Sequence, residues 1–305
     1  MDKQTITSTI KKKALELGFS ACGCAPAKPL KQYETFFKFW LSKGLQASMQ
    51  YMENYVEKRL DPTLLVPGAK SIVSVLLNYF PEKSQPDNVP LVAKYAYGHD
   101  YHFVIKKKLK QLLSFINSEL TECNGRYFTD SAPVLERAWA VEAGLGWIGK
   151  NTNLIAPKKG SYFFIGELII DLELEYDRPV GDFCGTCTRC IDACPTKALF
   201  QPYTLDSKKC ISYQTIENKG EIDKVVKPEL NNYIFGCDIC QDVCPWNRFS
   251  EPATELALQP HEGFMGLGTE SWQTMDEELF RQLFSHTPLS RVGFKGIRKN
   301  LAALF

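Results

Sequence analysis

The sequence lacks any apolar run long enough to cross a bilayer, which requires about 20 residues. Its most apolar stretch, YFFIGELIIDL at 162–172, is interrupted by Glu167. The opening residues, MDKQTITSTIKKK, lack the apolar core of a secretory signal. The net charge is only +1, so the composition indicates no global attraction to polyanions, although a local basic face is compatible with it. We therefore expect a soluble, cytoplasmic protein without internal repeats or low-complexity segments.

Cysteine is the residue whose number and spacing stand out. Residues 184–195 contain C-x2-C-x2-C-x3-C-P, the ligand pattern of bacterial ferredoxins, and a second group at 237–245 also ends in Cys-Pro. The fourth cysteine of such a motif ligates the other cluster. We therefore predict one 4Fe-4S cluster on Cys184, Cys187, Cys190 and Cys244. The second cluster is predicted on Cys194, Cys210, Cys237 and Cys240.

Structural zinc and disulfides are the alternatives for these cysteines. Zinc knuckles usually consist of two separated C-x2-C pairs, which differs from three ligands at successive x2 spacing. Disulfides require an oxidising compartment, which the absent signal sequence argues against. The remaining cysteines, Cys22, Cys24 and Cys123, are predicted to be buried as small apolar side chains.

Hydrophobic periodicity predicts helices that alternate with strands. The helical patterns cover 3–17, 30–44, 99–120, and a stretch from about Pro133 to Gly144. The first aromatic-rich pattern, 30–44, is predicted to pack into the core. The strand patterns cover 19–25, 70–79, 91–97, 125–130 and 161–174. We predict an α/β domain over 1–175, a ferredoxin-like module with two clusters over 176–250, and a short C-terminal basic segment over 251–305.

Two further motifs concern what the α/β domain binds. Residues 144–149, GLGWIG, match G-x-G-x-x-G, but they follow a helical pattern and contain the bulky Trp147, which disfavours dinucleotide binding. Asp130 ends a predicted strand just before Pro133. It could deliver a proton from that position, or it could simply cap the next helix, and the residues alone favour the cap.

The sequence resembles the epoxyqueuosine reductase family, iron-sulfur and cobalamin enzymes that complete queuosine in tRNA. The blocks that carry the resemblance, besides the eight cysteines, are EKRLDP, TDSAPVLERAWAVEAGLGWIGKN, CISYQTIENKG and FGCDICQDVCPWN. It covers roughly residues 1–250, and many family members continue into a helical-repeat domain that this sequence does not contain. The resemblance implies cobalamin in the α/β domain, and the sequence contains no D-x-H-x-x-G, which agrees with base-off binding. It also implies a cobalamin pocket formed by Arg59, Asp130, Lys150, Asn151, Leu154, Ile165, Ser212 and Asp238.

The activity implied by the resemblance is reduction of epoxyqueuosine to queuosine at the wobble position of tRNA. Electrons from an external low-potential donor would pass through both clusters to cobalamin, and Asp130 would protonate the departing oxygen. For tRNA contact we consider two groups of cations and three aromatic residues: Arg281, Arg291, Lys295, Arg298 and Lys299; Lys106, Lys107, Lys108 and Lys110; and Trp246, Phe249 and Trp272. The lysine group also fits the solvated side of a long helix. We expect a monomer. The alternatives are a dehalogenase-like reductase of a small molecule and an electron-transfer docking protein.

Overall fold

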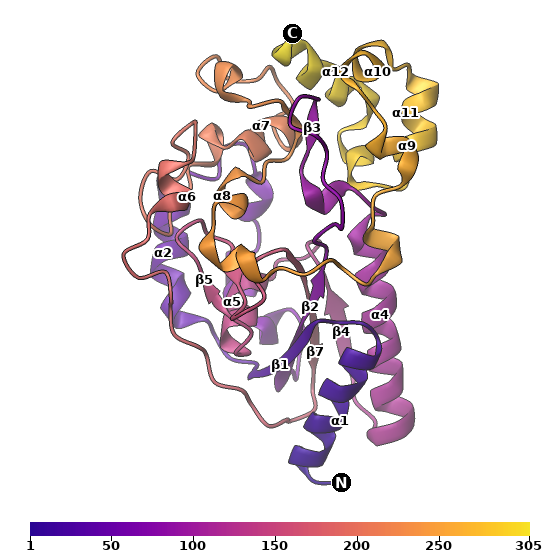
Figure 1. The fold of residues 1–305 in the computed structure, drawn as a ribbon. Coiled ribbons are helices and arrows are strands. Elements are labelled where there is room, and N and C mark those ends of the chain that lie inside the picture. The colour runs from indigo at the N-terminus through magenta and orange to yellow at the C-terminus, as the bar shows by residue number, and fades with distance from the viewer.

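The computed structural model describes residues 1–305, with the exception of the side chain of Glu262. Its centre is a four-stranded sheet in the order β1-β2-β7-β4, in which every neighbouring pair is antiparallel (Figure 1). The strands are β1 (Ala21–Pro26), β2 (Ser71–Asn78), β4 (Gly125–Phe128) and β7 (Phe163–Ile170). The two long strands are central and almost entirely buried, because their Val, Ile and Leu side chains are covered on both faces.

Two helices cover one face of this sheet: α1 (Lys3–Glu16) and α4 (Tyr101–Phe115). Asp2 caps α1 by accepting a hydrogen bond from the backbone of Thr5, and Asp100 caps α4 through His102. Gly166 allows α4 to approach β7 closely, because a Cβ there would lie 2.7 Å from a methyl carbon of Ile105. The predicted helix over 99–120 is confirmed, with its last turn a π-helix over Ile116–Leu120.

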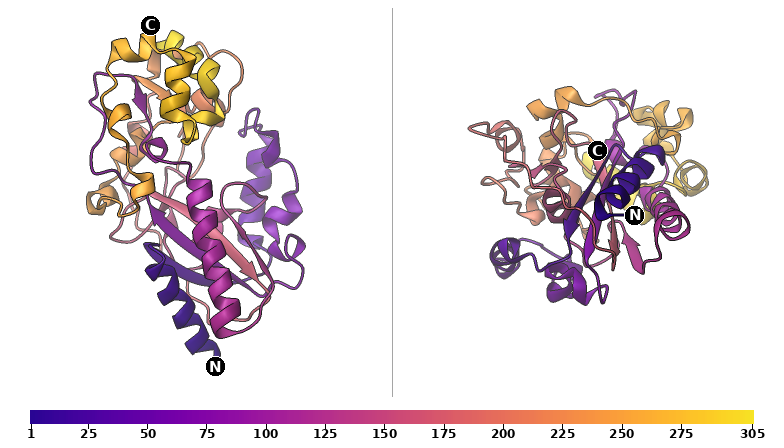
Figure 2. Two further views of the ribbon diagram at one scale, coloured as in Figure 1. Left: turned by 90° about the vertical axis from the view of Figure 1, so that its right-hand side faces the viewer. Right: turned by 90° about the horizontal axis from the view of Figure 1, so that it is seen from below.

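The other face is covered by α5 (Glu136–Glu142), with α2 (Lys31–Ser42) and α3 (Val56–Leu60) beyond it. The helix predicted to begin at about Pro133 begins three residues later. Helix α2 projects away from the sheet (Figure 2), so of its aromatic side chains only Phe37 is buried, whereas Phe36 and Phe39 are both 46% exposed. The prediction that the aromatic residues of this helix pack into the core is therefore confirmed for Phe37 and wrong for Phe36, with Tyr33 and Trp40 only partly buried.

The cysteine-rich region contains little regular structure. It has three short helices, α6 (Arg189–Asp192), α7 (Ile211–Ile216) and α8 (Ile239–Asp242), and one strand, β8 (Tyr233–Phe235). Strand β8 pairs in parallel with β3 (Leu91–Val92). The predicted strand over 91–97 is therefore only two residues long. It ends because the backbone N–H of Lys94 donates to the carboxylate of Asp238 and the chain turns into a 3-10 helix.

The C-terminal region is a packed group of helices: α9 (Glu262–Met265), α10 (Thr269–Thr274), α11 (Glu277–Phe284) and α12 (Gly293–Leu304). Trp272 is fully buried there and stacks on Phe284, so of its two possible roles, stacking on a base and packing in the core, the structure shows the second. Arg291 pairs with Glu217, and Lys299 donates to two backbone carbonyls. Much of the predicted basic segment thus serves internal contacts. Among the described residues, no helix combines the length and apolar character needed to cross a membrane.

Short elements complete the fold. The strands β5 (Trp147–Ile148) and β6 (Leu154–Ile155) form a small antiparallel hairpin. The 3-10 helices are Gln50–Met52, Pro62–Leu64, Lys94–Ala96, Ser207–Lys209, Lys227–Glu229, Pro245–Phe249, Leu256–Leu258 and Pro288–Arg291. The predicted burial is confirmed for Cys24 and Cys123, whereas Cys22 is only partly buried.

Candidate active site and cluster module

The two cysteine groups have the same local form. Cys190 lies in α6 and Cys240 lies in α8, and these two helices pack against each other. Each helix is followed, after a short turn, by a cysteine and a proline. This approximate symmetry is expected where each group supplies ligands to both clusters of a ferredoxin-like module. All eleven cysteines of the chain are free of disulfides. Within the described part of the chain, no three His, Cys, Asp or Glu side chains lie close enough to hold a single metal ion.

The sulfurs fall into neighbourhoods that follow the two predicted ligand sets. Burial, together with the nearby sulfurs of Cys244, Cys184 and Cys187, raises the pKa of the Cys190 thiol to about 11. Burial also raises the pKa of Cys240 well above its ordinary value, with further increases from Cys210, Cys190 and Cys194. Cys190 belongs to the first predicted set but also lies near Cys240 of the second, so the two sets of sulfurs lie next to each other. Because iron binds thiolates, ligation must offset the cost of charging these buried sulfurs.

The hairpin β5-β6 connects both cysteine groups to the sheet domain. The Nζ atom of Lys150 donates to the carbonyls of Gly185 and Cys187, at 2.6 and 3.0 Å. The side-chain amide of Asn151 donates to the carbonyl of Cys240, at 3.2 Å. The glycines of GLGWIG serve this packing, since a Cβ on Gly146 would lie 2.2 Å from the carbonyl oxygen of Ile155. The motif is therefore part of a hairpin and not a strand-turn-helix phosphate site.

A cavity of about 340 Å³ lies between the sheet and the second cysteine set. Six of the eight residues predicted for the cobalamin pocket line it: Asp130, Asn151, Leu154, Ile165, Ser212 and Asp238. All four cysteines of the second set line it as well: Cys194, Cys210, Cys237 and Cys240. The cysteines of the first set are not part of its wall. Much of the remaining wall is aromatic, with Tyr79, Tyr95, Tyr101, Phe163 and Phe164. We call this space the inner cavity.

Arg59 and Lys150, also predicted for the pocket, are not among the residues that line the inner cavity. Lys150 serves the cysteine loop described above. Arg59 is buried and its guanidinium group donates to the carbonyl of Tyr51, at 2.6 Å. Tyr51 lies near the charges of Glu217, Arg291, Asp130 and Arg59, and its pKa is raised to about 12, chiefly by burial. Arg59 thus supports a segment close to Asp130 without lining the cavity.

Asp130 occupies a special position in the wall of the inner cavity. Its backbone has a φ of 47°, in the left-handed region that aspartate tolerates better than most residues. The hydroxyl group of Tyr101 donates to its carboxylate, and the Nε2 atom of His102 lies 3.8 Å from the same oxygen. Helix α5 begins only at Glu136, after an N-cap residue whose side chain makes no capping bond. The interpretation of Asp130 as a helix cap was therefore wrong.

Two carboxyl groups for which no role was predicted lie behind Asp130: the half-buried Glu136 and the fully buried Glu167. The side chain of Glu136 accepts a hydrogen bond from the backbone N–H of Asp130. Burial, and then the charge of Asp130, raise the pKa of Glu136 to about 8. Glu167 is fully buried, and burial with the nearby Glu136 raises its pKa well above the ordinary value. Neither of its oxygens has a hydrogen-bond partner among the described residues. The interruption of an apolar strand by Glu167 was the available sequence signal.

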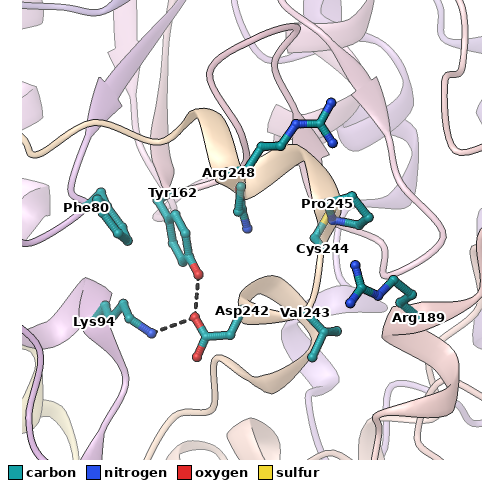
Figure 3. Close-up of a pocket in the computed structure, with 10 residues that line it drawn as sticks. Phe80, Lys94, Tyr162, Arg189, Asp242, Val243, Cys244, Pro245 and Arg248 are labelled. Carbon is teal, nitrogen blue, oxygen red and sulfur yellow. Dashed lines mark hydrogen bonds and ion pairs between the residues drawn. The ribbon is translucent and has the colours of Figure 1, made fainter.

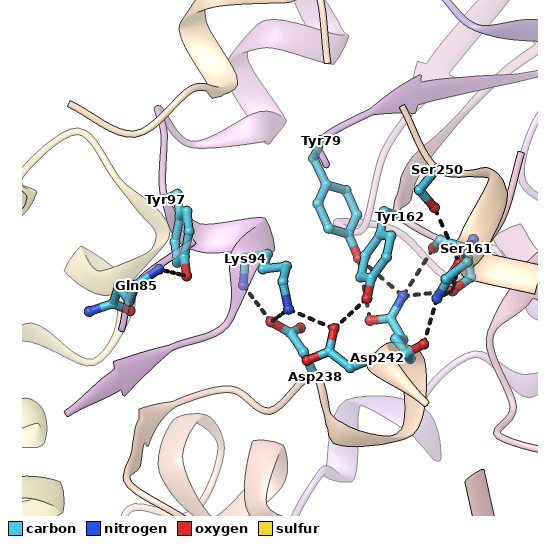
Figure 4. Close-up of polar contacts among 11 residues, drawn as sticks. Tyr79, Gln85, Lys94, Tyr97, Ser161, Tyr162, Asp238, Asp242 and Ser250 are labelled. Carbon is cyan, nitrogen blue, oxygen red and sulfur yellow. Dashed lines mark hydrogen bonds and ion pairs between the residues drawn. The ribbon is translucent and has the colours of Figure 1, made fainter. Parts of the chain in front are cut away.

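A network of polar contacts, which we call the polar wall, includes Tyr79, Ser161, Asp238 and Gln241 of the inner cavity lining and continues to Lys94, Tyr162 and Asp242 (Figure 4). On the inner side, the amide of Gln241 donates to Ser161 and contacts the hydroxyl group of Tyr79. On the outer side, the Nζ atom of Lys94 pairs with Asp242 at 2.6 Å and lies 3.6 Å from Asp238. Burial raises the pKa of Asp238 to about 6, against the opposing effect of Lys94. These contacts therefore hold residues 238–242, in and next to α8, in place against the sheet domain.

Comparisons with known proteins agree on one family. Residues 183–247 match the family profile described as a 4Fe-4S double cluster binding domain. Residues 59–131 match the one described as epoxyqueuosine reductase QueG, DUF1730. The chain is 50% identical to the epoxyqueuosine reductase of Cellulophaga algicola over 98% of both chains.

Solved structures support the same relationship. A crystal structure of epoxyqueuosine reductase with an epoxyqueuosine-modified tRNA stem loop is 29% identical, with a TM-score of 0.91 over 98% of this chain and 80% of that one. A reductive dehalogenase structure described in terms of B12-dependent dehalogenation shares the fold at 16% identity, with a TM-score of 0.52 over 100% of this chain and 36% of that one. The predicted fold class, with its double-cluster module, is thereby confirmed.

Proposed function

The chain belongs to the epoxyqueuosine reductase family, and from this premise we propose that it reduces epoxyqueuosine to queuosine at the wobble position of tRNA. One observation carries the proposal: a single cavity joins Asp130 to all four cysteines of the second set. Such a cavity brings a proton donor and a source of electrons to the same substrate. We further propose that residues 1–175 bind cobalamin, 176–250 hold the clusters and 251–305 contact tRNA in a monomeric, cytoplasmic enzyme.

The lining of the inner cavity fits cobalamin chemically. Its aromatic and aliphatic side chains suit the faces of a corrin ring. The side chains of Asn151, Asn153 and Ser212 offer donors and acceptors to the amides at the rim of a corrin. The lining residues include no histidine, which agrees with base-off binding without a protein imidazole below the cobalt. When bound, cobalamin supplies a cobalt centre of low potential for electron delivery.

Loss of the epoxide oxygen as water, with formation of the alkene, consumes two electrons and two protons. Asp130 is placed to protonate the departing oxygen, which converts a poor alkoxide leaving group into a hydroxyl group. The hydrogen bond from Tyr101 holds the carboxylate, and Glu136 holds the backbone of the same residue.

Anaerobic reconstitution tests this function directly. Protein loaded with iron, sulfide and cobalamin should convert a tRNA stem loop that carries epoxyqueuosine, with dithionite as the reductant, and the product nucleoside should be detected by mass spectrometry. Absorption should show both cluster and corrin bands. Retention of clusters without any corrin would leave an electron-transfer docking protein, and corrin binding without turnover of the stem loop would favour a small-molecule reductase.

A further inference from the structure

A second hollow, which we call the outer cleft, lies on the far side of the polar wall and is open to solvent (Figure 3). Its volume is about 480 Å³. The residues that line it are Phe80, Lys94, Tyr162, Arg189, Asp242, Val243, Cys244, Pro245, Asn247 and Arg248. None of these residues is among those that line the inner cavity. The outer cleft is therefore separate from the inner cavity. The proposed reaction, which takes place in the inner cavity, gives the outer cleft no role.

The outer cleft lies against the first predicted cluster. Cys244, a predicted ligand of that cluster, forms part of its wall, and Arg189 directly precedes a second ligand, Cys190. The inner cavity, in contrast, is lined by the cysteines of the second set. Electrons that pass from the first cluster to the second and then to the inner cavity would thus enter the protein beside the outer cleft. This step depends on the proposed function and on the proposed division of the ligands.

The rim of the cleft carries an excess of positive charge. Arg189 and Arg248 are exposed, and neither forms an ion pair with any described residue. Lys94 differs from them, because it is only 12% exposed and is neutralised by Asp242 and Asp238. The guanidinium group of Arg248 lies 4.4 Å from the ring centre of Phe249, which limits its freedom. Two arginines are therefore available to a partner.

The surface between these arginines is apolar. Val243, Pro245 and Phe80 are each partly exposed in the cleft. Figure 3 shows the two guanidinium groups on opposite sides of Pro245 and not directed at one point. A site for a single phosphate would require converging donors, whereas apolar side chains bordered by a charged rim are typical of a transient protein interface. Small interfaces of this kind are used by weak electron-transfer complexes.

We propose that the outer cleft docks an acidic one-electron carrier protein, whose carboxylates meet Arg189 and Arg248 and whose redox centre reduces the first cluster. Each encounter moves one electron: the carrier is oxidised by one electron and the cluster is reduced by one. No covalent bond forms or breaks at this surface. Two encounters deliver the two electrons that removal of one epoxide oxygen consumes. Opposite charges chiefly accelerate association, so the interaction is sensitive to salt.

Charge reversal at both arginines tests the proposal. The double variant Arg189→Glu/Arg248→Glu is compared with Lys12→Glu/Lys43→Glu, which reverses two exposed cations elsewhere, one of them also placed over an aromatic ring. The probe is a reduced bacterial ferredoxin of acidic surface. Its binding is measured by calorimetry at low and high salt, and cluster reduction is measured by stopped-flow absorption. The arginine variant should lower the second-order rate constant about 10-fold or more at low salt, and the control pair should leave it unchanged.

Dithionite provides the discriminating comparison, because a small reductant needs no docking surface. Cluster content, cluster reduction by dithionite and the KM for the tRNA stem loop should match those of the unmodified protein. A raised KM for the stem loop with dithionite would assign the cleft to RNA and overturn the proposal. Unchanged ferredoxin binding would overturn it as well.

A conservative variant distinguishes the loss of positive charge from damage to the cluster. Arg189→Lys/Arg248→Lys retains the charge and should retain most of the rate with ferredoxin, and loss of the rate in that variant would contradict a role in charge steering. If the stem loop is never converted but ferredoxin binding still depends on the two arginines, the docking site stands and the proposed substrate fails.

Discussion

The inner cavity and the outer cleft lie on two sides of one polar wall, and their chemistry is opposite. The inner cavity is lined by tyrosines and by carboxyl groups such as Asp130, with buried acids behind them. The outer cleft is open and is bordered by arginines. Proton transfer requires a donor held within hydrogen-bonding distance of the reacting atom, whereas electron transfer to a cluster requires only a close approach of the electron donor.

This contrast separates the expected effects of substitutions. Changes in the inner cavity should impair turnover with every reductant, since they act on the chemistry of the substrate. Changes in the outer cleft should impair only turnover that depends on a protein donor. On the inner side, the expected effect decreases from Asp130 through Tyr101 to the pair Glu136 and Glu167.

Replacement of Asp130 by Asn should have the largest effect. The amide cannot protonate the departing oxygen, so kcat should fall by about 10²- to 10⁴-fold with dithionite and with ferredoxin alike. Iron content and corrin absorption should be unchanged. The exposed Asp87→Asn is a suitable control and should have normal kcat. Equal turnover in the two variants would remove Asp130 from the chemistry and would break the contrast between the two sites.

The clusters could be predicted from the sequence because their signal is local. Ligand spacing within ten residues, such as Cys184 to Cys194, is a property of one short segment. The positions of helices such as α4 were also predictable, since apolar residues recur on one face and an aspartate caps the start. The division of the eight cysteines between the two clusters stays a prediction, since Cys190 of the first set also lies near Cys240 of the second.

The surroundings of Asp130 could not be predicted in this way. Its partner Tyr101 is 29 residues away in the sequence and comes from a different element. Glu167 lies behind it because β7 pairs with β4 in an antiparallel sheet, where Phe128 is opposite Glu167. The start of α5 was misplaced because the backbone of Asp130 binds Glu136, so the intervening residues form a loop. Such contacts depend on strand order, which no single segment encodes.

Replacement of Tyr101 by Phe should have an intermediate effect. The phenyl ring preserves the packing of this mostly buried side chain but removes the hydroxyl group that donates to Asp130. A hydrogen bond to a charged group contributes about 1.5 kcal/mol, which corresponds to a fall in kcat of roughly 10-fold with either reductant. Tyr203→Phe removes a similar bond to Asp182 outside both hollows and serves as the matched control. A Tyr101→Phe variant that lost rate only with ferredoxin would place this tyrosine on the electron side of the comparison.

Substitution within the pair Glu136 and Glu167 should have the smallest effect. It should change the stability of the protein and the dependence of that stability on pH. The folded-state pKa of Glu136, about 8, is higher than that of an exposed glutamate, so the folded protein holds a proton that the unfolded chain releases near pH 4.5. The stabilisation from that proton is complete below about pH 4.5 and is lost as the pH rises through about 8. The other charged or titratable groups that face the pair are Asp130, Arg137 and Tyr101. Raising the pH should therefore lower the Tm of the wild-type protein.

Glu167→Gln removes one of the two carboxyl groups and retains the shape of the side chain. Burial and the nearby Glu136 raise the pKa of Glu167 well above its ordinary value, so the variant lacks one group that binds a proton more tightly in the folded state. The Tm of the variant should therefore fall less between pH 5 and pH 9, as measured anaerobically by circular dichroism with the clusters present. The exposed Glu173→Gln is the control, because Lys3 lowers the pKa of Glu173 and its loss acts in the opposite direction. Identical pH profiles for the wild type and Glu167→Gln would mean that water reaches this pair. In that case Glu136 and Glu167 would be as hydrated as the side chains of the outer cleft, and the two sites would differ in charge alone.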